Sequence, residues 1–320
     1  MSENDQKPLS TTLAFDVGGT RLKAGLVSAQ TLSSFSTINQ DQRAKDGGAL
    51  ASVLHIGRRM LAEQRIDAVG IAIRGIVDPA SGTLLDVNGP LSEYVGQSIA
   101  LPIAEALGVP VFLENDARMY ALGELVCGAG RAYQNIVCLT LGTGVGCSVA
   151  LERRILRGSR GVGGILAGHI TVQVDGPSCT CGNRGCLEAL IGTAALTQAI
   201  QEALCSEPTS LLRDSPADPQ QLFRAAAVGD ALASMLVERF TRHLGAGIVS
   251  LIHTYDPDVV ILGGGLLHAS AQFLPGVQAY VDTHAWTLPR RRVKVVSAQL
   301  GDTAALLGIA ALIQDPTMLR

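Results

Sequence analysis

Residues 13–23 read Leu-Ala-Phe-Asp-Val-Gly-Gly-Thr-Arg-Leu-Lys and predict two strands joined by a tight turn. The run from 13 to 17 is short and apolar, Gly18-Gly19-Thr20 supplies the turn, and residues 22–27 predict the returning strand. The first predicted element of the fold is therefore a hairpin with glycines at its turn.

The second half of the chain repeats this pattern. Residues 135–141 predict a strand, residues 142–146 read Gly-Thr-Gly-Val-Gly, and residues 147–151 predict the return. Two strand–turn–strand units in one chain predict a duplicated α/β fold with two lobes around a central cleft. We expect the smaller lobe to hold residues 1–117 and about 301–320, and the larger lobe to hold residues 118–300.

Apolar periodicity predicts the elements between and after the hairpins. The expected strands are residues 68–73, 109–113 and 259–262, and the expected helices are residues 49–62, 99–107 and 116–125. A longer helical stretch over residues 223–254 is expected to break near Gly245–Gly247. Loops are expected from residue 74 to Ser98 and over residues 214–221.

Both glycine turns are candidates for binding phosphate. A turn without side chains lets backbone N–H groups approach phosphate oxygens. The candidates are Gly18, Gly19 and Thr20 in the first turn, and Gly142, Thr143 and Gly144 in the second. Asp16 could hold Mg²⁺ through water. Each turn alone could be an ordinary hairpin corner, and no Walker A lysine follows either, but the pair together favours a bound polyphosphate.

A third glycine cluster follows the strand at 259–262, where Gly263, Gly264 and Gly265 stand in a row. Glycines at this point would let an adenosine ring pack flat against the backbone. The alternative is a buried strand followed by a turn.

Glu114-Asn115-Asp116 lies where a strand is expected to pass into a helix. Asp116 there could cap the helix. It could instead accept a proton from a hydroxyl that attacks phosphorus, because phosphoryl transfer needs one base to orient the nucleophile. Asn115 would then bind a neighbouring hydroxyl.

His169, Cys179, Cys181 and Cys186 form the most specific local pattern. Cys₃His is a standard ligand set for structural Zn²⁺, and the turn-rich segment between the ligands can fold around an ion. Three buried free thiols are the alternative. A thioredoxin-like site is disfavoured because Cys-X-X-Cys is absent.

Composition excludes several other classes of protein. Hydrophobic residues make up 47% of the 320 residues and charged residues 17%, which is a globular balance. A net charge of −3 gives no general attraction to nucleic acid or to an anionic membrane. The chain has no apolar run of roughly 20 residues and no signal-peptide core, so a cytoplasmic location is expected.

Taken in order, these segments resemble the ROK family (repressor, open reading frame, kinase) of the actin–hexokinase–Hsp70 superfamily. The resemblance runs from Leu13 to about Ile313 and includes a Gly-x-Val-Asp stretch at Gly75 to Asp78. It is most specific at Gly168-His169 and over residues 179–188, which read Cys-Thr-Cys-Gly-Asn-Arg-Gly-Cys-Leu-Glu.

The resemblance implies two lobes of duplicated actin-like, ribonuclease H-like architecture that transfer the γ-phosphoryl group of ATP, with Mg²⁺, to a sugar hydroxyl. Asp116 would be the base, and structural Zn²⁺ would shape the sugar pocket. His169 would bind zinc through one ring nitrogen and sugar through the other. A homodimer or homotetramer is expected. Sugar contacts are implied for Gly75, Asn88, Asn115, Asp116, Leu166, His169 and Glu188, and nucleotide contacts for Asp16, Gly18, Gly19, Thr20, Lys23, Gly142, Thr143, Gly144, Gly264 and Gly265.

The chain departs from the family pattern on the sugar side. Leu166 stands where relatives carry a glutamate that binds hydroxyls near the anomeric carbon, and Arg74 stands where many carry proline. Leu166 would leave a glucose hydroxyl unpaired, which predicts a preference for N-acetylhexosamines.

Two other functions fit the same resemblance. A sugar-responsive repressor would need a DNA-binding domain, and only about a dozen residues precede the first expected strand. We therefore expect no nucleic-acid partner, and we interpret the basic cluster from Pro289 to Lys294 as a solvated turn. A sugar-binding pseudokinase is the second alternative, motivated by Leu166.

Overall fold

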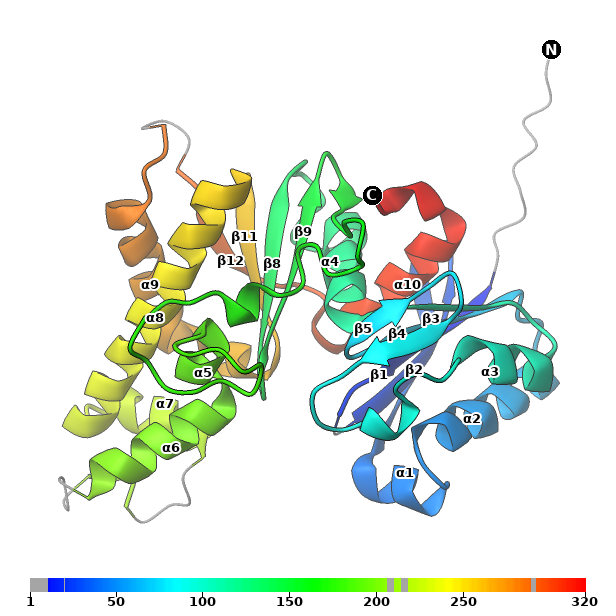
Figure 1. Ribbon diagram of the computed structural model, residues 1–320, viewed down its shortest axis with the longest axis horizontal. Helices are drawn as coiled ribbons and strands as arrows, with labels where there is room; N and C mark the ends of the chain where they lie inside the picture. The colour runs from blue at the N-terminus through cyan, green and yellow to red at the C-terminus, as the bar shows by residue number, and fades with distance from the viewer. Residues whose placement is uncertain (1–10, 20, 206–209, 214–217, 289–291) are drawn as a thin grey trace. The chain divides into compact units, whose positions relative to one another are not determined.

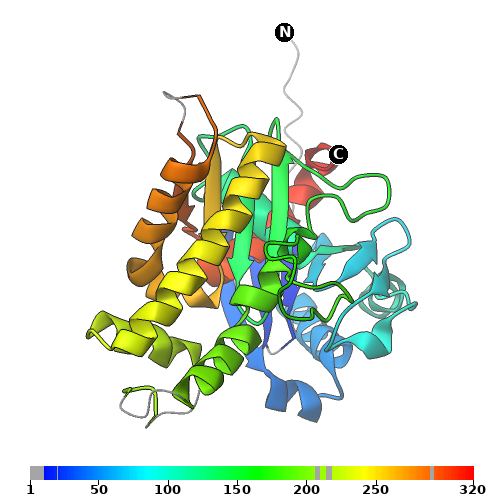
Figure 2. The same cartoon turned by 60° about the vertical axis from the view of Figure 1, so that its left-hand side comes forward.

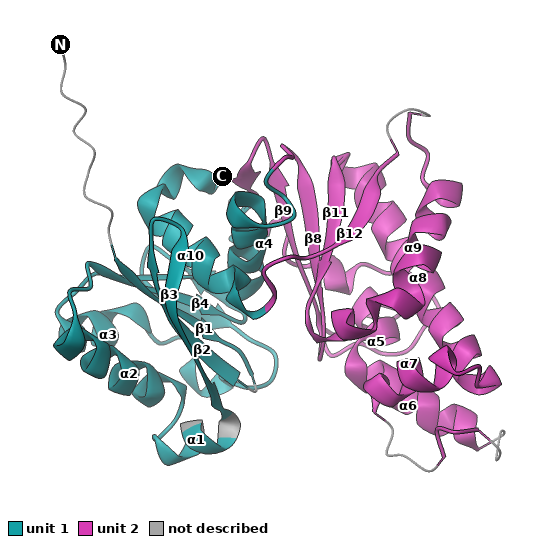
Figure 3. Cartoon of the chain, turned by 180° about the vertical axis from the view of Figure 1, so that it is seen from behind, with its two compact units in different colours: residues 1–131, 157–162, 302–320 teal, residues 132–156, 163–301 magenta. Residues whose placement is uncertain are grey.

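The computed structural model describes residues 11–19, 21–205, 210–213, 218–288 and 292–320 (Figure 1). The chain divides into two compact units (Figure 3). Unit 1 contains residues 1–131, 157–162 and 302–320, and unit 2 contains residues 132–156 and 163–301. Each unit has its own apolar core.

Unit 1 is built on a five-stranded sheet of order β3-β2-β1-β4-β7. Its strands are β1 (Thr12–Val17), β2 (Arg21–Ser28), β3 (Thr31–Asn39), β4 (Ala68–Ile73) and β7 (Val111–Asn115). Its helices are α1 (Gln40–Lys45), α2 (Ala49–Glu63), α3 (Ala100–Leu107), α4 (Asp116–Cys127) and α10 (Ala304–Gln314).

Large and small residues separate onto opposite faces of this sheet. Leu13, Phe15 and Val17 of β1 enter the core that α2 and α3 share. The opposite face carries small residues, which let α10 approach closely. A Cβ atom at Gly70 of β4, for example, would lie 2.6 Å from Cγ1 of Ile309. Because side chains alternate along each strand, the large residues face α2 and α3 and the small residues face α10.

Unit 2 has a five-stranded sheet of order β10-β9-β8-β11-β12. Its strands are β8 (Ile136–Leu141), β9 (Val145–Leu151), β10 (Arg154–Ile155), β11 (Val259–Gly263) and β12 (Lys294–Ser297). Its helices are α5 (Leu187–Ile191), α6 (Thr193–Leu204), α7 (Pro219–Ala227), α8 (Ala231–Tyr255) and α9 (Ser270–His284). Helices α8 and α9 pack side by side in both views (Figures 1 and 2).

The two sheets share one topology, which confirms the predicted duplication. In each, the first strand of a hairpin (β1 or β8) pairs antiparallel with its return and parallel with a later strand (β4 or β11). That later strand then pairs parallel with the last strand of the sheet (β7 or β12). The α/β fold expected from the glycine turns is therefore present in both halves.

Three local expectations need correction. The loop expected up to Ser98 contains a small sheet of β5 (Ile76–Asp78) and β6 (Thr83–Asp86). The loop expected over 214–221 contains the start of α7 at Pro219, while residues 214–217 lie outside the described part of the chain.

The third correction concerns the long helical stretch, which breaks at residues 228–230 and not at Gly245–Gly247. The Asp230 side chain accepts a hydrogen bond from the Ala233 N–H and so begins α8. Gly245 and Gly247 are packing positions instead. Their Cβ atoms would lie 2.6 Å from the Tyr280 ring and 2.7 Å from Leu187 Cδ2.

Helix α4 belongs to unit 1, although the expected boundary at 117 assigned it to the other lobe. It packs along α10, and the two helices approach closely where Gly123 meets the Ala304 carbonyl group and Gly308 meets the Met119 carbonyl group. The compact unit therefore extends to residue 131. No helix in the described part of the chain is both long and apolar enough to cross a membrane.

A buried ion pair fixes the junction between β7 and α4. Arg118 Nη1 lies 2.9 Å from Glu114 Oε1, and both side chains are 0% exposed. Arg118 Nη2 also donates to the Gly161 carbonyl oxygen at 2.7 Å, which ties the segment 157–162 to unit 1. Glu114 Oε1 accepts a further bond from the Asn115 N–H. The last residues of β7 and the first turn of α4 are thus held by one charge pair.

Replacing Arg118 with Met should destabilise the protein by about 3–5 kcal/mol, because Glu114 stays buried and loses its hydrogen-bonded partner, which the longer contact of 3.9 Å between Arg157 Nε and Glu114 Oε2 does not replace. The control is Arg65→Met, whose guanidinium is 88% exposed and pairs with Asp67, and which should cost at most about 1 kcal/mol. Urea unfolding of both variants measures the difference. Equal small losses would show that the buried pair does not stabilise this junction.

Candidate active site

Asp116 stands at the first position of α4, directly after β7. The N-cap is Asn115 and not Asp116, because Asn115 Oδ1 accepts the Arg118 N–H at 3.1 Å. The Asp116 carboxylate accepts the Ala117 N–H at 2.8 Å and lies 3.2 Å from Asn115 Nδ2. Asn115 is therefore the N-cap residue, and Asp116 Oδ1 also accepts an N–H of the first turn of α4.

Burial and a neighbouring carboxylate change the acidity of Asp116. Burial, followed by the negative charge of Asp16, raises the pKa of Asp116 to about 6. The N–H of Ala117 and the positive charge of Arg74 oppose this rise. A carboxylate with such a pKa is ionised at neutral pH and is a better proton acceptor than an ordinary aspartate.

Asp16 and Lys23 face each other across the first hairpin, at paired positions of β1 and β2. Lys23 Nζ lies 2.9 Å from Asp16 Oδ2 and 3.0 Å from Asp302 Oδ1. Burial alone would lower the pKa of Lys23, but the Asp16 and Asp302 carboxylates outweigh it and the pKa is raised. Asp302 also pairs with Arg21, whose Nη1 lies 3.4 Å from Asp302 Oδ2, so two cations and two carboxylates gather beside the turn at Gly18 and Gly19. Thr20 lies outside the described residues.

Two sugar-contact candidates of unit 1 lie next to Asp116. Asn115 Nδ2 donates to the Gly75 carbonyl oxygen at 2.9 Å, so Gly75, Asn115 and Asp116 form one cluster. Asn88 is exposed in the turn after β6, two residues beyond Asp86, whose carbonyl oxygen packs against Gly75.

Sequence reasoning did not assign Asp302 or Arg74 to the site. Asp302 precedes α10 and resembles a helix-start residue, and it reaches Lys23 only because the chain folds back across unit 1. Arg74 follows β4 and was noted only as a departure from the family pattern.

The second glycine turn, between β8 and β9 of unit 2, is closed by a bond from the Gly142 N–H to the Gly144 carbonyl oxygen at 3.0 Å. Its two glycines differ in their surroundings. A Cβ atom at Gly142 would meet nothing within 4 Å, whereas one at Gly144 would collide with the Glu188 carboxylate. Thr143 lies between them.

The third glycine cluster joins β11 to the short helix at Gly265–Ala269. Gly264 has a φ of +87°, and a Cβ atom there would press on the backbone of Leu141. At Gly265 the space beyond the backbone is open within 4 Å. A flat ring could therefore approach the backbone at Gly265.

His169, Cys179, Cys181 and Cys186 come together in unit 2, with all their ligand atoms within 4.8 Å of one another. His169 Nδ1 lies 3.5 Å from Cys179 Sγ, and the sulfurs of Cys181 and Cys186 lie 3.7 Å apart. A tetrahedral zinc site has S···N edges of about 3.5 Å and S···S edges of about 3.8 Å, from Zn–N and Zn–S bonds of about 2.0 and 2.3 Å. The two distances match the corresponding edges of a tetrahedral zinc site, and the remaining ligand atoms lie within 4.8 Å of one another.

The backbone around this cluster is folded tightly. The Cys179 N–H donates to the Asn183 carbonyl oxygen, and the Gly182 N–H donates back to the Cys179 carbonyl oxygen. The Asn183 N–H lowers the pKa of Cys181, which favours its thiolate. Because Nδ1 of His169 faces the sulfurs, Nε2 is the ring nitrogen left for another ligand.

Leu166 lies one turn before His169, and its carbonyl oxygen accepts the His169 N–H at 2.9 Å. Its side chain is 44% exposed. Leu166 is therefore not a core residue of unit 2, and a polar side chain there would not be buried.

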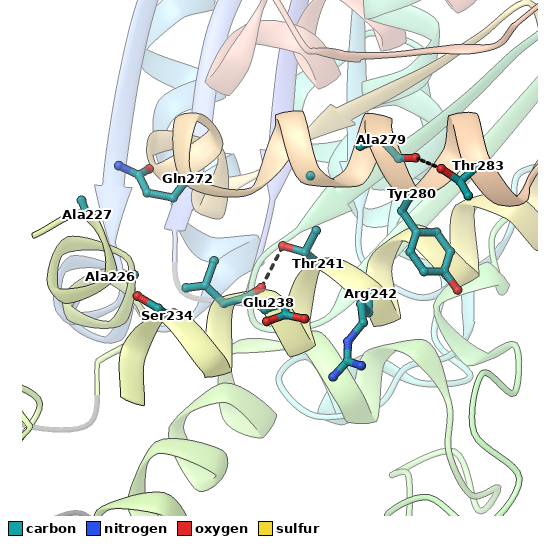
Figure 4. A pocket seen from close by; sticks show the side chains of 12 residues that line it. Ala226, Ala227, Ser234, Glu238, Thr241, Arg242, Gln272, Ala279, Tyr280 and Thr283 are labelled. Atoms are coloured by element: carbon teal, nitrogen blue, oxygen red, sulfur yellow. Dashed lines mark hydrogen bonds between the residues drawn. The ribbon is translucent and has the colours of Figure 1, made fainter. Parts of the chain in front are cut away.

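A groove of about 680 Å³ lies elsewhere in unit 2, among α7, α8 and α9 (Figure 4). Its lining includes Glu238, Thr241, Arg242 and Tyr280. None of the predicted site residues lines it.

Comparisons with known proteins place this geometry in a family. Residues 12–316 match the model of the ROK family. The chain is 31% identical over 315 residues to a protein named glucokinase from Thermotoga maritima, which covers 96% of this chain and 98% of that one. It is also 27% identical over 247 residues to a xylose repressor from Bacillus subtilis, covering 77% of this chain and 61% of the repressor.

A solved structure shares the fold. The ROK family glucokinase from Streptomyces griseus, in complex with glucose and AMPPNP, superposes with a TM-score of 0.81 at 28% identity and covers 95% of this chain and 99% of its own. A family match over nearly the whole chain, a relative above 30% identity and a shared two-unit α/β fold agree with one another. The chain belongs to the ROK family.

Proposed function

We propose that this protein transfers the γ-phosphoryl group of ATP to a hydroxyl of a hexose or N-acetylhexosamine, with Asp116 as the general base. The protein is a carbohydrate kinase, and the observation that supports the assignment of its base is the position of Asp116. Asp116 begins α4, and burial together with the negative charge of Asp16 raises the pKa of its carboxyl to about 6.

The proposed reaction needs one proton acceptor. The sugar oxygen forms a bond to the γ-phosphorus while the bond from that phosphorus to the β-bridging oxygen breaks, and ADP leaves. The hydroxyl proton passes to Asp116. Asn115 orients the sugar beside it, and Gly75 is held by the same amide. Such chemistry depends mainly on positioning and on charge stabilisation.

Each glycine turn offers backbone that a phosphate can approach, and the N–H groups of Gly18 and Gly142 already donate within their own turns to the carbonyl oxygens of Arg21 and Gly144. Mg²⁺ bound with ATP would neutralise the phosphate charge, and Asp16 is the carboxylate that would hold it through water. Lys23 keeps Asp16 and Asp302 in place, because its ammonium group contacts both carboxylates.

Zn²⁺ is the ion that we assign to His169, Cys179, Cys181 and Cys186. Three thiolates and one imidazole at tetrahedral spacing form a closed structural set with no open position for chemistry. The ion would fix the loop that carries His169, so that His169 Nε2 can bind a sugar hydroxyl.

Leu166 supports the proposed preference for N-acetylhexosamines. Its exposed side chain offers an apolar surface next to His169, where a carboxylate would bind hydroxyls. A methyl group can pack on that surface, whereas a hydroxyl of glucose would stay unpaired.

Regulation of transcription is the competing function, because a xylose repressor is among the relatives. ADP release measured over a panel of hexoses and N-acetylhexosamines, beside a gel-shift assay with DNA, separates the two. DNA binding that responds to sugar, without ATP turnover on any sugar, would refute the kinase assignment.

Asp116→Asn should lower kcat by at least about 10²-fold, because it removes the proton acceptor while keeping the side-chain shape. ATP affinity should change little. In the wild type, kcat/KM should fall as the pH drops through about 6, since the pKa of Asp116 is raised to about 6 and only the ionised form accepts a proton. The control is Asp41→Asn, an exposed carboxylate in the first turn of α1. Near-normal kcat in Asp116→Asn would remove Asp116 from the mechanism.

Elemental analysis should find about one zinc per chain. Cys181→Ser should lose or weaken this zinc and reduce sugar affinity and thermal stability, because the loop loses one of its four anchors. Cys205→Ser, an exposed cysteine outside the cluster, should keep the full zinc content. Purified protein that is fully active without metal contradicts the assignment.

Leu166→Glu should shift the ratio of kcat/KM for glucose over N-acetylglucosamine toward glucose by at least about tenfold, because a hydrogen-bonding group then pairs with the free hydroxyl. The Tm should stay close to that of the wild type, since Leu166 is 44% exposed and surface changes rarely cost more than about 0.5 kcal/mol. Leu166→Met is the size-matched control. The proposed pocket is wrong if the wild type already prefers glucose and a stable Leu166→Glu variant has the same substrate preference.

A further inference from the structure

The second glycine turn is fastened to the rest of unit 2 by one carboxylate. Glu188, in the first turn of α5, accepts the Val145 N–H through Oε2 at 2.9 Å. Val145 is 5% exposed, so this N–H is a buried donor that needs a partner. The same carboxylate occupies the space that a side chain at Gly144 would need.

Other contacts hold the turn on the same side. The Thr193 N–H donates to the Gly142 carbonyl oxygen at 3.0 Å, at the start of α6. Gly192 lies against the Thr143 carbonyl oxygen, and Gly168 lies against the Val145 carbonyl oxygen. Glu188 therefore contacts the backbone nitrogen of Val145, and Gly168 lies against its carbonyl oxygen.

The open side of the turn is its other face. A Cβ atom at Gly142 would meet nothing within 4 Å. With the Gly144 side filled by protein, a phosphate has access to the turn from the Gly142 side.

We infer that Glu188 is a positioning residue for the phosphate turn: its Oε2 atom holds the Val145 N–H so that the turn keeps the shape that binds ATP. This inference rests on the proposed function. It adds to the sugar contact implied by the family resemblance, which leaves Oε1 of the same side chain for the sugar. Cys186 is the N-cap residue of α5, so the predicted metal site fixes the helix end that presents Glu188.

A matched pair of variants isolates the hydrogen bond. Glu188→Gln and Glu188→Met have similar size and both lose the negative charge, but only glutamine keeps an oxygen that can accept the Val145 N–H. Glu188→Met leaves a buried donor unpaired. Any difference between the two variants therefore reports the bond and not the charge.

The experiment measures the Kd of Mg²⁺-AMPPNP by calorimetry without sugar. We expect Glu188→Met to bind roughly tenfold more weakly than Glu188→Gln, the factor that corresponds to about 1.4 kcal/mol for an unpaired donor. A wild type that binds no nucleotide refutes the proposed function and this inference with it. A wild type that binds nucleotide, with equal Kd values for the two variants, overturns the inference alone.

A second set of variants keeps the test decisive if Glu188→Met does not fold. Gly144→Ala forces its methyl group into the Glu188 carboxylate and should weaken nucleotide binding. In Glu188→Ala the space is vacant, so adding Gly144→Ala should cause little further loss. Strictly additive losses in this double-mutant cycle would overturn the inference, because they would mean that Glu188 and Gly144 act independently.

Discussion

The buried ion pair between Glu114 and Arg118 is the constraint on which the junction of β7 and α4 in unit 1 depends. It lies where a strand passes into a helix, and the residues between the two charges include Asn115 and Asp116. A charged pair with no exposure tolerates little movement, because any separation leaves an uncompensated charge in the core. Asp116 can therefore be partly desolvated, with a raised pKa, without losing its position.

The repeated sheet gives the two units the same hairpin but different chemistry around its turn. In unit 1, the strands of the hairpin carry Asp16 and Lys23 at paired positions, and Asp302 completes a group of charges. In unit 2, the turn is held by Glu188 from α5, two residues after Cys186 of the Cys/His cluster. One topology thus carries a cluster of charged side chains in unit 1 and, in unit 2, a backbone turn anchored beside the Cys/His cluster.

Features set by local sequence could be predicted, and features set by distant contacts could not. The hairpins, the strand Ala68–Ile73 and the Cys/His cluster depend on neighbours within a few residues or on a specific spacing. Strand β3 gave no signal because it is a mostly exposed edge strand without apolar alternation. Asp302 contacts Lys23, which lies 279 positions earlier in the chain, so local sequence gives no sign of this pair. The helix break was predicted at the wrong place because Gly245 and Gly247 are glycines that make room for Tyr280 and Leu187, and not helix breakers.

The second turn has glycine at positions 142 and 144 for two different physical reasons, which the sequence alone does not distinguish. Gly142 faces open space, where the absence of a side chain leaves room for a ligand. Gly144 faces Glu188, where the absence of a side chain leaves room for the protein's own carboxylate. A carboxylate beside a turn proposed to bind phosphate is unfavourable by charge alone, and the hydrogen bond that the buried Val145 N–H donates to Glu188 Oε2 at 2.9 Å offsets part of this cost. Glu188 therefore holds one side of the second turn, and the side at Gly142 is the one that the proposed function assigns to nucleotide.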